Sequence, residues 1–184
     1  LLYLRKLGLI SEETFRRPWV SQMGWIISGW SQAQANAAFC WIAEDFIRPT
    51  AREDIIAVLR NHVAQGHVVV LVSGMLAPIL AKVGESLGAM ITVGSATEIK
   101  DGRVTGKIGR VCMGIEKDQL TREVLQANHI DVDFAASYAY ADSISDMALF
   151  ELVGHPVAVY PDAKLKVIAL ERGWEIIGDT PKVG

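Results

Sequence analysis

Tyr140-Ala-Asp-Ser-Ile-Ser-Asp146 places two carboxylates, Asp142 and Asp146, four residues apart. The apolar run 134–139 comes directly before this segment and predicts a β-strand, and the run 147–153 after it predicts a helix. In open α/β sheets, ligands bind at the carboxyl ends of the parallel strands. Carboxylate oxygens are also the ligands that Mg²⁺ prefers. The segment therefore predicts an α/β fold and raises the question of a metal-dependent phosphate site.

Strand and helix patterns alternate outward from this segment, which predicts a parallel, doubly wound sheet. The β-branched run 68–72 is typical of a strand buried on both faces. Thr50-x-x-Glu53 has the form of a capping box that opens a helix, and Gly66 ends that helix. We expect further strands at 90–93, 134–140, 156–160 and 174–177, a hairpin at 98–108 around Asp101-Gly102, and helices at 78–87, 115–127, 145–153 and 162–172.

Residues 1–48 show no alternating strand pattern and are predicted to be helical. We assign them to a small cap domain, and residues 49–184 to the α/β core. The first segment carries four of the five tryptophans, at positions 19, 25, 30 and 41. They predict either a packed helical core or an apolar lid over a substrate pocket, and the two interpretations are compatible.

Composition narrows the class of protein. The 184 residues are 51% hydrophobic and 21% charged, as expected of a globular chain that can bury a core. The net charge is −3 and the sequence contains no long basic block, so nucleic acid and acidic membranes have no electrostatic support as partners. The apolar runs are too short to span a bilayer.

Cys40 and Cys112 do not form a metal-type spacing or suggest a disulfide framework, so we expect a reducing cytoplasm.

Several polar residues stand where chemistry could occur. Ser73 and Gly74 follow a predicted strand and precede a helix, where a hydroxyl and backbone N–H groups suit a phosphate. Lys117 opens a predicted helix against the helix macrodipole, so a particular role for it is worth seeking. The ordinary alternatives are helix caps for Ser73, Asp142 and Asp146, and a solvated surface residue for Lys117. The four histidines form no metal spacing and are expected to be surface or turn residues.

Taken in order, these features resemble the haloacid dehalogenase superfamily of phosphatases, and within it the phosphoserine-phosphatase-like branch with a helical cap. The resemblance covers nearly the whole chain and lies in an ordered set of motifs. These are Val-Val-Leu-Val-Ser73-Gly74, Asp101-Gly-Arg-Val-Thr-Gly106, Gly114-Ile-Glu-Lys117, the acidic segment ending at Asp146, Gly154-His-Pro-Val-Ala-Val and Glu171-Arg-Gly-Trp174. It implies a Rossmann-like core with a β-hairpin flap.

The resemblance also implies roles for particular residues. Ser73 and the Gly74 N–H would hold the phosphoryl group, and Lys117 would neutralise its charge. Asp142 would be a direct Mg²⁺ ligand, and Asp146 would support both the metal and the lysine. Ser145 stands where the family often has asparagine and is counted with the phosphate-binding residues. The substrate would be a small phosphorylated molecule.

The implied mechanism has two steps: an aspartate attacks phosphorus, and water then hydrolyses the aspartyl-phosphate. Its motif, Asp-x-Asp-x-Thr after a strand, is absent from the sequence. In the family this strand lies between those that end here at Ser73 and Asp142, so we expect the nucleophile in a segment that precedes Leu1. The alternatives are a catalytically inactive homologue that binds a phosphorylated ligand or a protein, and a domain fused to a larger enzyme such as an acyltransferase.

A second departure from the family concerns the substrate. Phosphoserine phosphatases use a cap arginine for the substrate carboxylate, but the sequence has neither arginine nor lysine between Pro18 and Ile47. Met75 also replaces a glycine that is common after the Ser-Gly of true phosphoserine phosphatases. We therefore expect a phosphomonoester whose alcohol part is less anionic than serine.

Overall fold

The computed structural model describes residues 12–178, so the helix expected over residues 1–11 lies outside the described part of the chain. Within these residues the chain forms two compact units, which divide between Cys112 and Met113. The helices that precede residue 48 belong to the same unit as the strands that follow them. The predicted division into a cap and a core at residue 48 stays a prediction.

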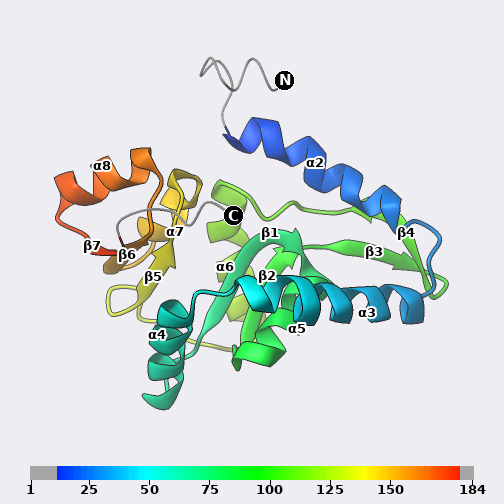
Figure 1. Ribbon diagram of the computed structural model, residues 1–184, viewed down its shortest axis with the longest axis horizontal. Coiled ribbons are helices and arrows are strands. Elements are labelled where there is room, and N and C mark those ends of the chain that lie inside the picture. The colour runs from blue at the N-terminus through cyan, green and yellow to red at the C-terminus, as the bar shows by residue number, and fades with distance from the viewer. Residues whose placement is uncertain (1–11, 179–184) are drawn as a thin grey trace. The chain divides into compact units, whose positions relative to one another are not determined.

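The first unit consists of helices around two small sheets (Figure 1). Strands β1 and β2 are parallel, β3 and β4 form an antiparallel hairpin, α5 packs on β1 and β2, and α2 packs along β4. The helices are α2 (Glu12–Ile26), α3 (Gln32–Trp41), the π-helix η1 (Ile42–Ile47), the 3₁₀ turn η2 (Arg48–Thr50), α4 (Glu53–Ala64) and α5 (Ala77–Leu87). The strands are β1 (Val70–Leu76), β2 (Ile91–Ser95), β3 (Thr97–Lys100) and β4 (Arg103–Ile108).

The core of this unit joins the helical segment to the strands. Ile27 and Phe39 pack with Leu76, Ile79 and Val104, all of them buried. Most of the tryptophans of the helical segment contribute little buried surface to this core. Three of them are largely exposed, with relative exposures of 67% for Trp19, 72% for Trp25 and 58% for Trp41. Trp30 alone of the four packs against the core cluster. The prediction of a tryptophan-rich core is therefore wrong for three of the four.

The predicted capping box at the start of α4 fails for an identifiable reason. The expected capping box at Thr50 does not form, because the chain turns through η2 and the Thr50 hydroxyl donates to the carbonyl of Ile47 at 2.7 Å. Helix α4 begins at Glu53, with Arg52 at its cap position. A genuine capping box opens α3 instead. There Ser31 Oγ accepts from the N–H of Gln34, and the Gln34 side chain accepts from the N–H of Ser31.

The strand before Ser73 starts later and reaches further than predicted. Val68 is 40% exposed and lies outside the strand, and most of β1 is only half-buried, so the expected strand buried on both faces is wrong. Ser73 and Gly74 lie inside β1 rather than after it. The register with β2 shifts between Val72 and Leu76, and α5 begins only at Ala77.

The hairpin turn is confirmed as predicted. Asp101 and Gly102 adopt φ angles of 50° and 71° between β3 and β4. A two-residue turn with both central φ angles positive matches the twist of the strands, which is why the Asp-Gly pair is so strong a signal.

The second unit is a three-stranded parallel sheet in the order β5-β6-β7 with helices between its strands. Phe150, Ala158, Leu165 and Ala169 form its buried core, and Trp174 packs against them. Its elements are α6 (Ile115–Ala127), β5 (Tyr138–Ala141), the 3₁₀ turn η3 (Ile144–Asp146), α7 (Met147–Phe150), β6 (His155–Val159), α8 (Ala163–Arg172) and β7 (Glu175–Ile177). Within residues 12–178, we find no helix with the length and apolar character to cross a membrane.

Predicted and observed elements differ most around β5. The helix at 115–127 is confirmed, but the strand begins at Tyr138 and not at residue 134. Asp133 closes a turn there, because its Oδ1 accepts from the N–H groups of Ala135 and Ala136 at 2.9 and 3.2 Å. The expected helix at 145–153 is reduced to η3 and the four residues of α7.

Candidate active site

The acidic segment leaves β5 as a short, internally bonded loop. Asp142 directly follows the strand and is exposed. Ser143 caps η3, where its Oγ accepts from the N–H of Ser145 at 3.3 Å and from the Ser145 hydroxyl at 3.1 Å. The sequence thus folds locally as a serine-capped turn that ends at Asp146. This turn presents two carboxylates in different surroundings, one exposed and one buried.

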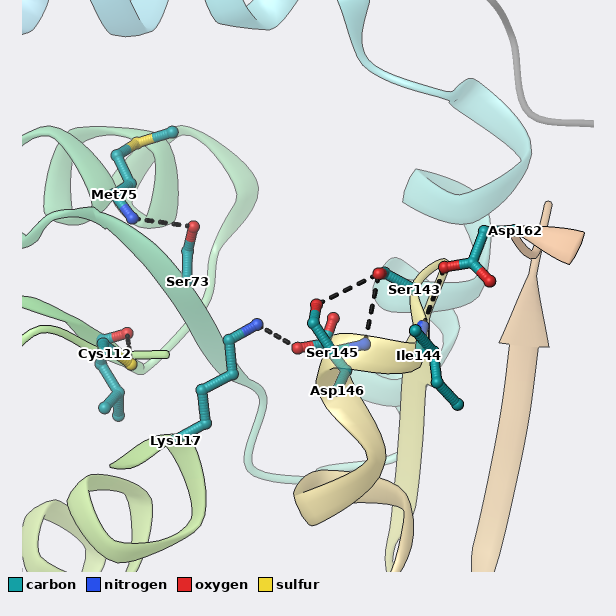
Figure 2. A network of polar contacts seen from close by, with 10 residues as sticks. Ser73, Met75, Cys112, Lys117, Ser143, Ile144, Ser145, Asp146 and Asp162 are labelled. Carbon is teal, nitrogen blue, oxygen red and sulfur yellow. Dashed lines mark hydrogen bonds and ion pairs between the residues drawn. The ribbon is translucent and has the colours of Figure 1, made fainter. Parts of the chain in front are cut away.

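The buried carboxylate is paired with the predicted lysine. Lys117 Nζ, from the first turn of α6, donates to Asp146 Oδ1, as Figure 2 shows. The side chains of Lys117 and Asp146 are only 12% and 11% exposed. A lysine is unfavourable in the first turn of a helix because of the macrodipole. The Asp146 carboxylate supplies the compensating negative charge, so the structure accounts for the lysine at this position.

Asp162 holds the acidic loop in place, and the sequence analysis missed this residue. It caps α8, where its Oδ1 accepts from the N–H groups of Lys164 and Leu165 at 3.0 and 2.9 Å. Its Oδ2 accepts from the N–H of Ile144 at 2.9 Å, and its own N–H donates to the carbonyl of Asp142 at 2.8 Å. The loops after parallel neighbours β5 and β6 meet at the same sheet edge, and this pair of bonds ties them together.

The signal that could have found Asp162 is its position. Tyr160-Pro-Asp162 directly precedes a helical run, and an aspartate there is an ordinary N-cap. The additional bond to Ile144 could not be read from that pattern, because the two residues lie 18 positions apart.

Ser73 and Gly74 lie in the first unit and have a well-defined local geometry. The Ser73 Oγ accepts from the N–H of Met75 at 3.2 Å, and its hydroxyl proton can still be donated. The carbonyl of Gly74 accepts from the hydroxyl of Ser95 at 2.8 Å. Ser95 is fully buried, and its Oγ also accepts from the N–H of Cys112 at 3.1 Å. This buried serine, which the sequence analysis also missed, fixes the backbone at Gly74.

The predicted site residues divide between the two units. Ser73 and Gly74 belong to the first unit, and Lys117, Asp142, Ser145 and Asp146 belong to the second. Within the second unit, the structure brings Lys117 together with Asp146, and Ser145 together with Ser143. Ser145 therefore serves the fold of the loop in addition to its predicted role at a phosphate.

The donor set suits a magnesium ion in part. Within residues 12–178, no cluster of three or more histidine, cysteine or acidic side chains could hold a metal by itself. Mg²⁺ usually keeps several waters and binds through one or two carboxylates together with substrate phosphates. Asp142 is exposed and its side chain makes no hydrogen bond or ion pair to the described residues, so it can supply such a carboxylate. Asp146 Oδ1 is already committed to Lys117.

A comparison with known proteins identifies the family. The model of the haloacid dehalogenase-like hydrolases matches residues 2–151. The chain belongs to this family. A probable phosphatase of Mycobacterium tuberculosis is 30% identical over 82% of this chain and 52% of its own length. The phosphoserine phosphatase SerB1 of the same organism is 30% identical over 82% of this chain and 48% of its own length.

A solved structure shows the same fold over almost the whole chain. It is a protein of unknown function from Bordetella pertussis, 28% identical, with a TM-score of 0.83 over 96% of this chain and 78% of that one. The family model and this structure confirm the predicted superfamily and the α/β fold class, and the similarity to SerB1 agrees with the predicted likeness to phosphoserine phosphatases. The chain spans about half the length of the curated relatives that it matches.

Proposed function

We propose that this protein is a Mg²⁺-dependent phosphomonoester hydrolase that works through an aspartyl-phosphate, with the nucleophilic aspartate upstream of Leu1. Family membership supports the reaction class. The observation that carries the proposal is the buried ion pair of Lys117 with Asp146, together with the exposed carboxylate of Asp142 at the carboxyl end of a parallel strand. A lysine ammonium held by a buried carboxylate is suited to phosphoryl transfer, where catalysis consists mainly of positioning and of stabilising charge.

Each predicted residue has a role in this proposal. Lys117 neutralises charge on the phosphoryl oxygens, and Asp146 fixes the ammonium in position. The Ser73 hydroxyl proton and the Gly74 N–H donate to phosphoryl oxygens. Ser145 keeps its predicted place among the phosphate-binding residues.

Asp142, supported by Asp146, would hold the magnesium ion. When bound, the ion neutralises charge that develops on the transferred group. Cys40 and Cys112 form no disulfide with each other, and this supports a reducing cytoplasm as the proposed compartment.

The test is phosphate release by the natural full-length protein. We expect chelation to abolish activity and added Mg²⁺ to restore it. Asp142→Asn should raise the Mg²⁺ concentration needed for half-maximal activity, and Lys117→Met should lower kcat by about 10²–10³-fold. Asp131→Asn and Lys164→Met, at exposed positions of the same unit, serve as matched controls. Activity that survives both chelation and Asp142→Asn would refute the assigned metal role.

We further propose that the substrate carries a less anionic alcohol than serine. The segment from Pro18 to Ile47 has no arginine or lysine, and it exposes Trp19, Trp25 and Trp41. Aromatic side chains favour apolar or uncharged groups over a carboxylate that must keep its hydration. A panel of phosphomonoesters should give a higher kcat/KM for neutral or aromatic alcohols than for phosphoserine. A strong preference for phosphoserine would contradict this.

The exposed aromatic residues also support a second candidate function, a catalytically inactive homologue that binds a phosphorylated ligand or a protein. Trp41 and Phe46 form a tilted aromatic pair, with 58% and 68% of each residue exposed. Such a protein would bind phosphorylated compounds without releasing phosphate, whatever cation is present. The same phosphate-release assay, combined with equilibrium binding, separates the two functions.

A further inference from the structure

Helix α4 ends in a backbone motif that brings two histidines together. The N–H of Gly66 donates to the carbonyl of Val63, and the N–H of His67 donates to the carbonyl of His62, each at 3.0 Å. Gly66 adopts a φ of 80°. This is the Schellman arrangement, in which the residue after the left-handed glycine lies against the residue five positions earlier. A His-x-x-x-Gly-His pattern thus becomes a spatial pair, although the spacing resembles no standard metal motif.

Three other helices show what these positions carry. The N–H of Ile130 donates to the carbonyl of Leu125 at the end of α6, and the N–H of Trp174 donates to the carbonyl of Ala169 at the end of α8. At the end of α5, the N–H of Ala89 donates to the carbonyl of Gly84. All three pairs lack polar side chains, and an apolar contact is common in this motif. Among these four helices, α4 alone places two imidazoles there, so closing the helix end does not by itself account for the histidines.

The two rings face each other through the same nitrogen atom. His62 Nδ1 and His67 Nδ1 are 2.8 Å apart, and the ring centroids are separated by 5.1 Å. One Nδ1 must carry a proton at this distance, and the other must accept it. Burial, together with the neighbouring His67, lowers the pKa of His62.

We propose that His62 and His67 form a two-histidine site for a borderline divalent transition metal, of which Zn²⁺ is the representative. Zinc–imidazole bonds of 2.0–2.1 Å at a tetrahedral angle place the two nitrogens about 3.3 Å apart, so the rings need to separate by only about 0.5 Å. The proton on one Nδ1 moves to its Nε2 through solvent, and the imidazoles stay neutral. His67 is exposed and His62 is half-buried, so water could reach the remaining positions around the metal.

The experiment titrates Zn²⁺ into the full chain by calorimetry, in excess Mg²⁺ and in a background of Asp142→Asn and Cys40→Ser. This background prevents zinc at the acidic loop or at the exposed thiol from being counted. We expect one equivalent of zinc to bind, and His67→Asn or His62→Asn to weaken binding by at least roughly tenfold, because each removes one of two protein ligands. His129→Asn, at an exposed histidine of the second unit, should leave the affinity unchanged.

Nitrogen NMR of the histidine rings on the same protein gives an independent readout that needs no variant. Zinc should shift Nδ1 of His62 and His67 and leave the rings of His129 and His155 in place. The proposal is overturned if zinc does not bind, if His67→Asn binds it as well as the parent, or if the shifts fall on other histidines. None of these outcomes depends on phosphatase activity.

Discussion

Replacing Asp162 should loosen the acidic loop by an amount that the structure lets us work out. Its carboxylate accepts three backbone hydrogen bonds, two at the start of α8 and one from Ile144. Loss of an N-cap costs about 1 kcal/mol. Leaving the partly buried N–H of Ile144 without an acceptor costs about 1–2 kcal/mol more. Asp162→Ala should therefore lower the free energy of unfolding by about 2–3 kcal/mol.

Asp162→Asn separates the two contributions. Asparagine caps helices as well as aspartate does, so one side-chain oxygen can keep the bonds to α8. The atom that replaces Oδ2 is then an amide NH₂ group, which is a hydrogen-bond donor. It cannot accept from the N–H of Ile144, so that bond is lost. We expect a cost of about 1–2 kcal/mol, carried almost entirely by the loop.

The assays are urea unfolding and hydrogen exchange at the Ile144 amide. Both variants should speed exchange at Ile144 strongly. Asp133→Ala is the matched control, because Asp133 also accepts two local N–H bonds but is not bonded to the acidic loop. An Asp162→Asn variant as stable as the parent, or unchanged protection of Ile144 in Asp162→Ala, would refute the reasoning.

Three further predictions concern the second unit. Lys117→Met should cost about 3–5 kcal/mol because it leaves Asp146 buried without its partner. Adding Asp146→Leu should recover part of that loss in urea unfolding, and strictly additive costs would contradict the pairing. Gly154→Ala should cost about 3 kcal/mol because its Cβ would strike a backbone carbonyl. Gly173→Ala is the control, because its Cβ meets only open space and the positive φ alone should cost about 1 kcal/mol. Equal losses of stability in the two variants would argue against close packing at Gly154. Partial burial raises the pKa of Tyr140, so stability should fall above pH 10, where the unfolded tyrosine ionises first. Phenolate absorbance follows the ionisation of Tyr140. Urea unfolding of Tyr140→Phe should show a smaller fall in stability above pH 10, and an unchanged fall would contradict the assignment to Tyr140.

The parts of the fold that the sequence predicts well depend on local signals. The helix at 115–127 matches its prediction because its periodicity and the preceding Gly114 act within the segment itself. The Asp101-Gly102 turn also matches its prediction, because it depends only on the φ angles of these two residues. The position of Lys117 in a first helical turn, against the macrodipole, is also a local signal, because it indicates a residue whose role is worth seeking.

The rest could not be predicted because it depends on contacts distant in sequence. Ser95 looks like the polar end of an apolar strand, yet its hydroxyl bonds to Gly74 and Cys112, which lie on either side of it in the chain. The exposure of Trp19 and Trp25 depends on which helix face meets the core, and composition does not fix that choice. The pairing of His62 with His67 depends on a left-handed Gly66, which a search for standard metal spacings overlooks.

The two carboxylates of the acidic loop are divided between two tasks by their surroundings. Asp146 is buried and bonded to Lys117, so moving it to an incoming cation would break a buried ion pair. Asp142 is exposed, while its carbonyl is held by the N–H of Asp162. The backbone at Asp142 is thus fixed even though its side chain is accessible. A carboxylate on a fixed backbone loses less conformational entropy when it binds a cation. For the proposed magnesium site, the geometry of the second unit therefore favours Asp142 as the direct ligand and Asp146 as the residue that positions the lysine.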